Sequence, residues 1–383
     1  MTTPQTKRYS ADVYERLARH LDNLPAGFPP TENGVELRIL RRLFMPEEAE
    51  LAPHLTLVAE EPRVIARRAG LPVADAARCL AQMEKKGLVY AIHRPHRPPR
   101  YMAAQFVVGI YEYQVGKLDP ELVQDIEEYM PQWWDFDGWK KAPQLRTIPV
   151  GESIDPHLDV WPYEQAGELV RGHKAVAVAP CICRQEQHLI GSGCEKPLES
   201  CLTFDQAAHY FVRNGMSRWV SQDEALAILA RAEEAGLVLQ PGNSREVLSI
   251  CTCCGCCCGV LRNIKRHPKP ASIVASAFQA TLNPATCLGC GACTGRCQME
   301  ALHLDDGQAV LDPDRCIGCG LCVTTCPSGS LRLARKPESE QPHVPRNIVE
   351  STIRLGQSRG RMSVGELVGM QVRSVVDRLL APR

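Results

Sequence analysis

The sequence predicts a multidomain protein of the α+β class. Three observations carry this prediction: a helical N-terminal region that ends in a short hairpin, a central cysteine-rich region in which strands alternate with helices, and eight C-terminal cysteines at a repeated spacing. At 383 residues the chain is long enough for two or three domains. We expect the boundaries to fall at residues 1–105, 106–270, 271–335 and 336–383.

Composition excludes several classes of function. The chain has 44 basic and 44 acidic residues, so its net charge favours neither nucleic acid nor a membrane surface. It contains no run of 18 apolar residues, and its first residues lack the apolar core of a signal peptide. Nineteen cysteines without an export signal indicate a reducing cytoplasm and metal binding rather than disulfides. We therefore expect a cytoplasmic protein without a membrane span.

The N-terminal region combines helices with a short hairpin. Apolar residues at helical spacing, followed by Gly87 as a C-cap, predict helices over Val35–Phe44, Val64–Ala69 and Val73–Lys86, and then strands over Leu88–Ala91 and Tyr101–Phe106. This order resembles the winged-helix type of helix-turn-helix domain. The resemblance implies that the third helix enters the DNA major groove.

Two features disfavour DNA as a partner. The third helix begins with Val73, Ala74 and Asp75, which are poor readers of bases, and a carboxylate repels phosphate. Residues 1–100 carry 16 basic against 12 acidic side chains, a surplus of only four. We therefore interpret this winged-helix-like domain as a packing or docking module, and Cys79 on its third helix as a small buried side chain.

The central region, predicted as a cysteine-rich α/β domain, contains ten cysteines. A strand at Ala175–Ala179 leads into Cys181 and Cys183, which lie on one side of an extended chain. Together with Cys194 and Cys201 they make a possible set of four ligands. After a helix over Asp223–Gly236, the remaining six form a block. If that block is extended, one face carries Cys251, Cys253 and Cys257, and the other carries Cys254, Cys256 and Cys258.

The ten thiols leave several metal centres open. They suffice for two [4Fe–4S] cubanes with two thiols left over, or for one fused cluster with extra ligands. Four of them could instead bind a structural zinc ion. We expect at least one further iron–sulfur centre in this region.

Eight cysteines in the C-terminal region form two copies of the spacing C-x2-C-x2-C-x3-C. They are Cys287, Cys290, Cys293 and Cys297 in the first copy, and Cys316, Cys319, Cys322 and Cys326 in the second. The pattern resembles the ligand run of bacterial ferredoxins that hold two [4Fe–4S] clusters. Pro327 follows the second copy as in that family, whereas Gln298 takes the corresponding place in the first.

The ferredoxin resemblance implies how the ligands divide. The fourth cysteine of each copy binds the other cluster in that family. Cluster one is then expected to take Cys287, Cys290, Cys293 and Cys326, and cluster two Cys316, Cys319, Cys322 and Cys297. Strands at Ala301–Leu304, Ala309–Leu311 and Leu331–Leu333 are expected around these loops, and Gly307 forms the turn of a hairpin. Lys336–Arg346 reads as a linker and Val364–Leu380 as an amphipathic helix.

A wider resemblance covers residues 100–335. The arrangement C-x-C-R, then C-x6-C, then C-x-C-C-x-C-C-C before the ferredoxin-type region is similar to largely uncharacterised 4Fe–4S-binding proteins of anaerobes. The Cys253-Cys254-Gly255 triple also resembles the cysteine–cysteine–glycine motifs of heterodisulfide-reductase-type subunits, without the rest of their spacing. The wider resemblance implies electron carriage.

The sequence thus predicts an electron-transfer protein rather than a stand-alone enzyme. It would relay single electrons through two [4Fe–4S] clusters, with a further central cluster, to or from a redox partner protein or oxidoreductase subunit. The sequence has no phosphate-binding loop and no dinucleotide fingerprint. Two alternatives remain open: a redox-responsive winged-helix regulator, and a reductase with an open iron site in the central cluster.

Overall fold

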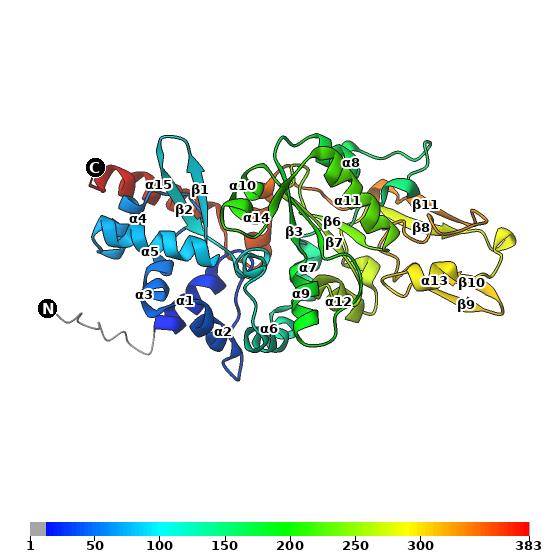
Figure 1. Ribbon diagram of the computed structural model, residues 1–383, viewed down its shortest axis with the longest axis horizontal. Helices are drawn as coiled ribbons and strands as arrows, with labels where there is room; N and C mark the ends of the chain where they lie inside the picture. The colour runs from blue at the N-terminus through cyan, green and yellow to red at the C-terminus, as the bar shows by residue number, and fades with distance from the viewer. Residues whose placement is uncertain (1–12, 383) are drawn as a thin grey trace. The chain divides into compact units, whose positions relative to one another are not determined.

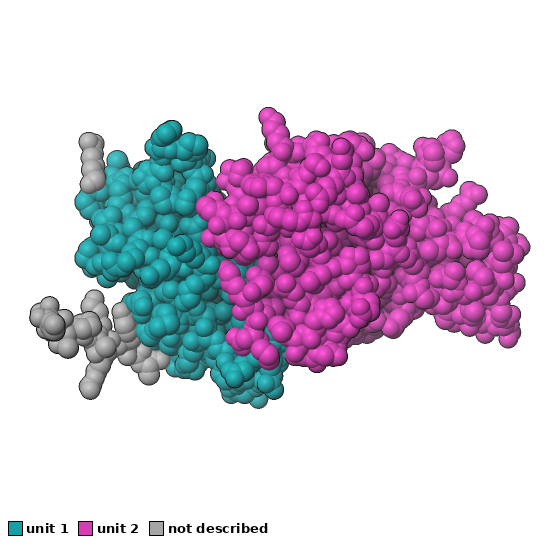
Figure 2. All heavy atoms as spheres, viewed as in Figure 1, with its two compact units in different colours: residues 1–114, 121–133, 359–383 teal, residues 115–120, 134–358 magenta. Residues whose placement is uncertain are grey.

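The structure, a computed structural model, describes residues 13–382, which divide into two compact units (Figure 2). Among the described residues, unit 1 contains 13–114, 121–133 and 359–382, and unit 2 contains 115–120 and 134–358. Most of the predicted central segment and all of the predicted ferredoxin-type segment therefore share unit 2. This sharing matters because both cysteine-rich regions lie in one compact body.

Unit 1 is mainly helical and carries one two-stranded hairpin (Figure 1). Its elements are α1 (Val13–Asn23), α2 (Val35–Leu43), α3 (Pro46–Leu51), α4 (Pro62–Ala69), α5 (Val73–Lys86), β1 (Val89–Arg94), β2 (Arg97–Ala103), most of α6 (Pro120–Trp133) and α15 (Val364–Leu380). The antiparallel hairpin pairs Val89 with Ala103 and ends at a turn around His96, whose φ is 57°.

The sequence predicted most of unit 1 correctly at the level of elements. Helix α5 has the predicted bounds, and Gly87 ends it with φ 79° in the left-handed region. Leu80 and Met83 on its inner face are fully buried. Helices α1 and α3 were not expected, and the wing strands begin and end a few residues away from the predicted positions. The winged-helix identity of this unit remains a prediction.

Helix α15 is attached to unit 1 through its polar side. Asp377 is buried and accepts hydrogen bonds from Arg67 Nη1 at 2.6 Å and from Arg68 Nε at 2.9 Å, both on α4. Arg68 also forms an ion pair with the buried Glu60. The predicted apolar stripe of α15, from Val364 to Leu379, is largely exposed. Ion pairs, rather than apolar burial, therefore anchor this helix.

Unit 2 is built around a five-stranded sheet with the order β5-β3-β4-β7-β6. The sheet and the elements around it are α7 (Phe136–Lys141), α8 (Ala166–Arg171), β3 (Val176–Pro180), α9 (Ile182–Leu189), β4 (Glu199–Phe204), α10 (Asp205–Arg213), β5 (Arg218–Val220), α11 (Gln222–Glu234), β6 (Val238–Pro241), β7 (Ser249–Cys253) and α12 (Gly259–Arg266). Helices α10 and α11 both pack on β3 and β4. Val176, Val178 and Ile228 belong to the main core between sheet and helices.

The sheet corrects the prediction that the central region is of the α/β class. Every neighbouring pair of strands in it is antiparallel. Helix α10 links β4 to β5, and these two strands run in the same direction. However, β3 lies between them and runs the opposite way. Alternation of helix and strand along the chain therefore does not imply parallel neighbours here.

The C-terminal part of unit 2 contains two small antiparallel pairs of strands. Its elements are β8 (Phe278–Leu282), α13 (Ala292–Arg296), β9 (Leu302–Asp305), β10 (Gln308–Leu311), β11 (Leu331–Arg335) and α14 (Ile348–Ser358). The predicted hairpin is confirmed: β9 pairs with β10 around Gly307, whose φ is 75°. The closing strand β11 pairs with β8, a strand that the sequence did not predict. Among residues 13–382, no helix is both long and apolar enough to cross a membrane.

Replacing Asp377 with alanine is expected to release α15 from unit 1. The change leaves Arg67 and part of Arg68 without their buried acceptor, which costs about 1–3 kcal/mol. Hydrogen exchange of the full-length chain measures this as faster exchange of the α15 amides. Glu50→Ala is the matched control, because Glu50 and its partner Arg16 are both exposed and such a pair contributes less than about 1 kcal/mol. Equal exchange rates in the two variants would contradict the proposed anchor.

Candidate metal centres

The C-terminal cysteine loops need glycine at defined positions. Gly289 and Gly318 each follow the first cysteine of a copy by two residues and have φ of 63° and 69°. A Cβ atom on Gly289 would lie 1.8 Å from the carbonyl oxygen of Gly307, and one on Gly318 would lie 2.1 Å from that of Phe278. Both the backbone angle and the lack of space therefore require glycine.

Backbone amides donate hydrogen bonds to several of these sulfur atoms. Ala280 N–H reaches Cys316 Sγ at 3.3 Å, and Ala301 N–H reaches Cys297 Sγ at 3.2 Å. The amides of Gly289 and Ala309 both point at Cys287 Sγ, at 3.4 and 3.5 Å. Such N–H···S bonds stabilise thiolates and influence the reduction potential of a bound cluster.

The pKa shifts of the C-terminal cysteines indicate two groups of neighbouring thiols. The first group surrounds Cys293. Burial raises the pKa of Cys293, and negative charge on Cys290, Cys287 and Cys326 raises it further.

In the second group, burial raises the pKa of Cys319 to about 12, although the backbone amide of Leu321 opposes the shift. Negative charge on Cys297 and Cys316 adds to the increase. Burial also raises the pKa of Cys322, and negative charge on Cys319, Cys316, Cys297 and Cys293 raises it further. The surroundings of Cys293 and of Cys319 thus each include one cysteine from the other copy, and Cys322 lies near both Cys297 and Cys293 of the first copy. Thiols with raised pKa values bind metal with release of their protons.

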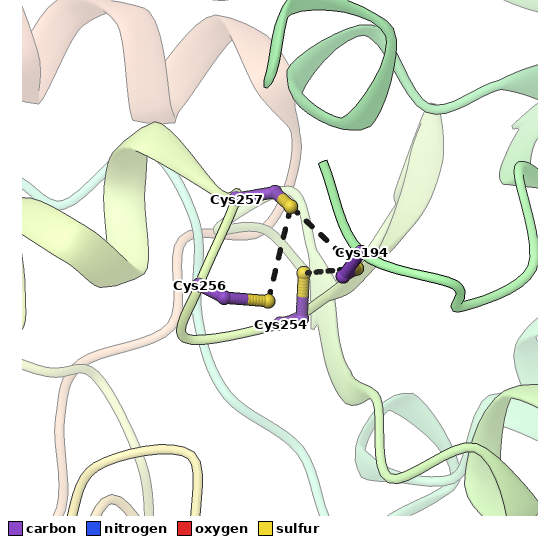
Figure 3. A group of neighbouring side chains, drawn as sticks. All are labelled: Cys194, Cys254, Cys256 and Cys257. Atoms are coloured by element: carbon purple, nitrogen blue, oxygen red, sulfur yellow. Dashed lines mark hydrogen bonds between the residues drawn. The ribbon is translucent and has the colours of Figure 1, made fainter. Parts of the chain in front are cut away.

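Four of the central cysteines point toward one another (Figure 3). Cys254, Cys256 and Cys257 lie on the turn between β7 and α12, and Cys194 comes from the loop after α9. Their sulfur atoms all lie within 4.8 Å of one another. Three pairs are closer: Cys194–Cys257 at 3.5 Å, Cys256–Cys257 at 3.8 Å and Cys194–Cys254 at 3.9 Å. We call this set the four-thiol group.

The other six central cysteines form a row of neighbouring thiols. In order of contact, the row is Cys201, Cys251, Cys253, Cys258, Cys183 and Cys181. Hydrogen bonds with Cys183 and Cys253 lower the pKa of Cys258 to about 5, and those with Cys201 and Cys253 lower the pKa of Cys251. We call this set the six-thiol row.

These groupings differ from those expected from an extended chain. Strand β7 ends at Cys253, and the chain then turns before α12 starts at Gly259. The turn breaks the alternation of faces, so Cys257 joins Cys254 and Cys256, while Cys258 joins Cys251 and Cys253. Cys194 likewise belongs to the four-thiol group instead of joining Cys181, Cys183 and Cys201. Cys181 and Cys183 are neighbours as expected, but at the N-terminus of α9 rather than on a strand.

Arg184 lies between the two central sets. Its side chain is fully buried, and Nη1 is 3.9 Å from Cys254 Sγ and 3.2 Å from the carbonyl oxygen of Thr252. Cys181 and Cys253 of the six-thiol row lie close enough to interact with its charge. Within the described part of the chain, Arg184 has no carboxylate partner. A buried cation normally needs a counter-charge. Hydrogen bonds from the Cys257 amide and from Cys256, together with the charge of Arg184, outweigh burial and lower the pKa of Cys254 to about 7. Hydrogen bonds to neighbouring thiols and burial instead raise the pKa values of Cys181 and Cys253.

The turn that carries the four-thiol group also touches the C-terminal cysteine loops. Gly255 N–H donates to Gln298 Oε1 at 2.8 Å, and Gln298 follows Cys297 directly. A Cβ atom on Gly255 would lie 2.3 Å from the carbonyl oxygen of Gln298, so only glycine fits this contact. Gln298 stands where the ferredoxin pattern has proline. The sequence showed this departure but did not predict the contact with Gly255.

Comparison with known proteins identifies one region of the chain. Residues 280–333 match the family model of the 4Fe-4S dicluster domain. The chain therefore contains an iron–sulfur module of the kind used in electron transfer. Comparisons with curated proteins and with solved structures gave no match.

The donor set of the dicluster domain fits iron–sulfur clusters. Its cysteines occur in two converging loops, amides donate to their sulfur atoms, and glycines give the backbone the room that the loops need. Cys290 is exposed, whereas Cys316 and Cys322 are buried. One of the two groups of thiols thus reaches the surface, while the other lies inside unit 2.

Replacing Gly318 with alanine is expected to disrupt the second cysteine loop. The new Cβ atom would push against the Phe278 carbonyl in β8, so β8 or the loop must shift and iron should be lost from the anaerobically purified protein. Gly329→Ala is the matched control: its φ is 64°, but no atom lies within 4 Å of the added Cβ. That variant should lose only about 1–2 kcal/mol of folding stability to backbone strain and keep its iron. Iron and sulfide assays measure the difference, and equal iron contents would argue against the steric constraint.

Proposed function

We propose that this protein relays single electrons between a redox partner protein and an iron–sulfur centre in its central region, by way of two [4Fe–4S] clusters in the dicluster domain. In this proposal the partner carries out the organic or terminal redox chemistry. When bound, the clusters supply one-electron carriers, and the chain's own residues set their spacing, burial and access.

For the dicluster domain we propose crossed ligand sets. Cluster one is assigned to Cys287, Cys290, Cys293 and Cys326, and cluster two to Cys316, Cys319, Cys322 and Cys297. The electrostatic neighbourhoods of Cys293 and Cys319 support this assignment, because each includes a cysteine from the other copy. The crossed arrangement would bring the two clusters close enough for electrons to pass between them.

One observation carries the relay. The main hydrophobic core of unit 2 contains Cys253 and Cys258 of the six-thiol row, and Cys251 of that row packs against the same core together with Cys297 and Cys319. The six-thiol row and the ligands assigned to cluster two are therefore parts of one packed interior. A redox centre in the row would exchange electrons with cluster two through this interior, without passing through solvent.

The six-thiol row fits a polynuclear centre better than a single ion. It offers six sulfur donors, whereas a single structural zinc ion takes four ligands. Hydrogen bonds lower the pKa of Cys251 and Cys258 and favour the thiolate form, which binds iron. Hydrogen bonds to neighbouring thiols and burial raise the pKa of Cys181, Cys183 and Cys253, so these three release their protons when metal binds. Arg184 supplies a buried positive charge beside the row. We therefore assign the further iron–sulfur centre to Cys181, Cys183, Cys201, Cys251, Cys253 and Cys258.

The surface around cluster one is the proposed port for the partner. Cys290 is exposed, and the neighbouring Leu288 has 71% of its surface exposed. Leu304 on β9 is also exposed and reaches the loop at Gly291. We propose that the partner docks on these exposed apolar side chains beside cluster one. An electron would then cross from the partner to cluster one, and from there to cluster two and the central centre.

Anaerobically purified protein is expected to contain more than about 8 irons per chain, because two cubanes account for about four each. Cys253→Ser should lower the iron and sulfide content while leaving the EPR signals of the two reduced dicluster-domain clusters in place. Cys322→Ser should instead remove or alter one of those two signals. Iron and sulfide assays combined with EPR of the reduced protein test both expectations.

Cys79→Ser is the control for these two variants. Cys79 lies in unit 1, away from the other cysteines in the sequence, and burial raises its pKa to about 12. Its substitution should change neither iron content nor spectra. An iron content near 8 that Cys253→Ser leaves unchanged would refute the central centre. The loss of both dicluster-domain signals in Cys322→Ser, with normal folding, would argue against separate crossed ligand sets.

A further inference from the structure

We propose that the four-thiol group binds a single divalent metal ion, with Zn²⁺ as the preferred ion, in tetrahedral geometry. The ion fixes the turn between β7 and α12. The ligands are Cys194, Cys254, Cys256 and Cys257. This site is separate from the electron relay, so it stands or falls independently of the function proposed above.

The distances between the sulfur atoms support one ion. With metal–sulfur bonds of about 2.3 Å, the edge of a tetrahedron of four sulfur atoms is about 3.8 Å. The three close pairs in this group lie at 3.5, 3.8 and 3.9 Å. In a cubane each thiolate binds a different iron, so its four sulfur ligands must stand farther apart. The spacing of the sulfur atoms in the four-thiol group therefore matches a single-ion site.

The dicluster domain provides an internal comparison. Its eight cysteines match the family model of a domain that holds 4Fe–4S clusters. Within residues 13–382, a search for three or more possible metal ligands whose donor atoms all lie within 4.8 Å of one another finds the four-thiol group. The cysteines of the dicluster domain do not come that close together as a set. The same chain thus spaces its cluster ligands more widely than these four thiols.

The surroundings suit a closed tetrathiolate site. Cys254 and Cys257 are buried beside Ala232 and Leu237, so apolar side chains line the buried side of the site. Cys256 is exposed and gives an ion access from the surface. Four thiolates around a divalent ion leave two negative charges, and the guanidinium of Arg184, 3.9 Å from Cys254 Sγ, offsets part of that charge. Four sulfur ligands with no open position are typical of structural zinc.

The ion would have a specific structural task. Three of its ligands lie on the turn whose Gly255 is hydrogen-bonded to Gln298, the residue after Cys297. The fourth ligand, Cys194, comes from a different loop of unit 2. By tying the turn to that loop, the ion would hold Gly255 against the dicluster domain.

The experiment measures metals in the full-length protein, purified anaerobically from cells supplied with both iron and zinc. Wild type is expected to contain one zinc per chain, and X-ray absorption at the zinc edge should give four sulfur ligands at about 2.3 Å. This measurement on the wild type does not depend on the folding of any variant. Zinc bound through nitrogen or oxygen, or no single-ion metal at all, would overturn the proposal.

Cys256→Ser tests the site directly, because Cys256 is the exposed ligand and its change should perturb folding least. We expect this variant to lose the zinc while keeping the iron and sulfide of the wild type. Loss of one iron without sulfide would equally support a single-ion site, with iron as the occupant. Loss of about four irons together with sulfide would overturn the proposal in favour of a cubane.

Cys79→Ser serves as the matched cysteine control and should retain every metal. A wild type that contains the zinc but little iron or sulfide would contradict the relay and leave the zinc site standing. A wild type with full iron and sulfide but no single-ion metal would contradict the zinc site and leave the relay standing. The two proposals therefore fail in distinguishable ways.

Discussion

The repulsion between buried thiolates is the constraint on which unit 2 depends. Ten cysteines of the central region and eight of the dicluster domain share this unit, and many of them are buried. Thiols at this density lose protons where positive charge or hydrogen-bond donors are close to them. Arg184 supplies one such charge from a fully buried position without a carboxylate partner in the described chain. Lys336 supplies a second charge beside Cys316. Two cations do not balance so many sulfur atoms, so a fully ionised set would require bound metal ions.

The part of the site that the sequence predicted is the part in which local spacing determines geometry. The two C-x2-C-x2-C-x3-C runs bring their own ligands together within short loops, and glycines such as Gly318 are required by backbone contacts within the same domain. Helix α5 was predicted for a similar reason, since its apolar spacing and the C-cap at Gly87 are both local signals. Where geometry follows from neighbours in the chain, the sequence is sufficient.

The central cysteines could not be grouped from the sequence because their grouping depends on where a strand stops. Alternation assigns Cys254 and Cys257 to opposite faces, but β7 ends at Cys253 and the following turn brings them together. Cys194 joins them from a loop about 60 residues earlier, and no local pattern signals that contact. The antiparallel sheet was missed for a related reason. Alternation of helix and strand along the chain shows which strands a helix connects. It does not show whether a third strand, such as β3, lies between them in the sheet.

Gln298 illustrates how a departure from a family pattern acquires meaning once the structure is known. A proline at this position would lack a side-chain oxygen to accept the Gly255 N–H, and the turn would lose its hydrogen bond to the dicluster domain. Glutamine provides that acceptor directly beside Cys297, and Gly255 leaves room for the close approach. The contact between these two residues therefore joins the turn with the central cysteines to the dicluster domain. A ferredoxin that acts alone has no central region to join, so the glutamine is explained by what lies upstream of the dicluster domain in this chain.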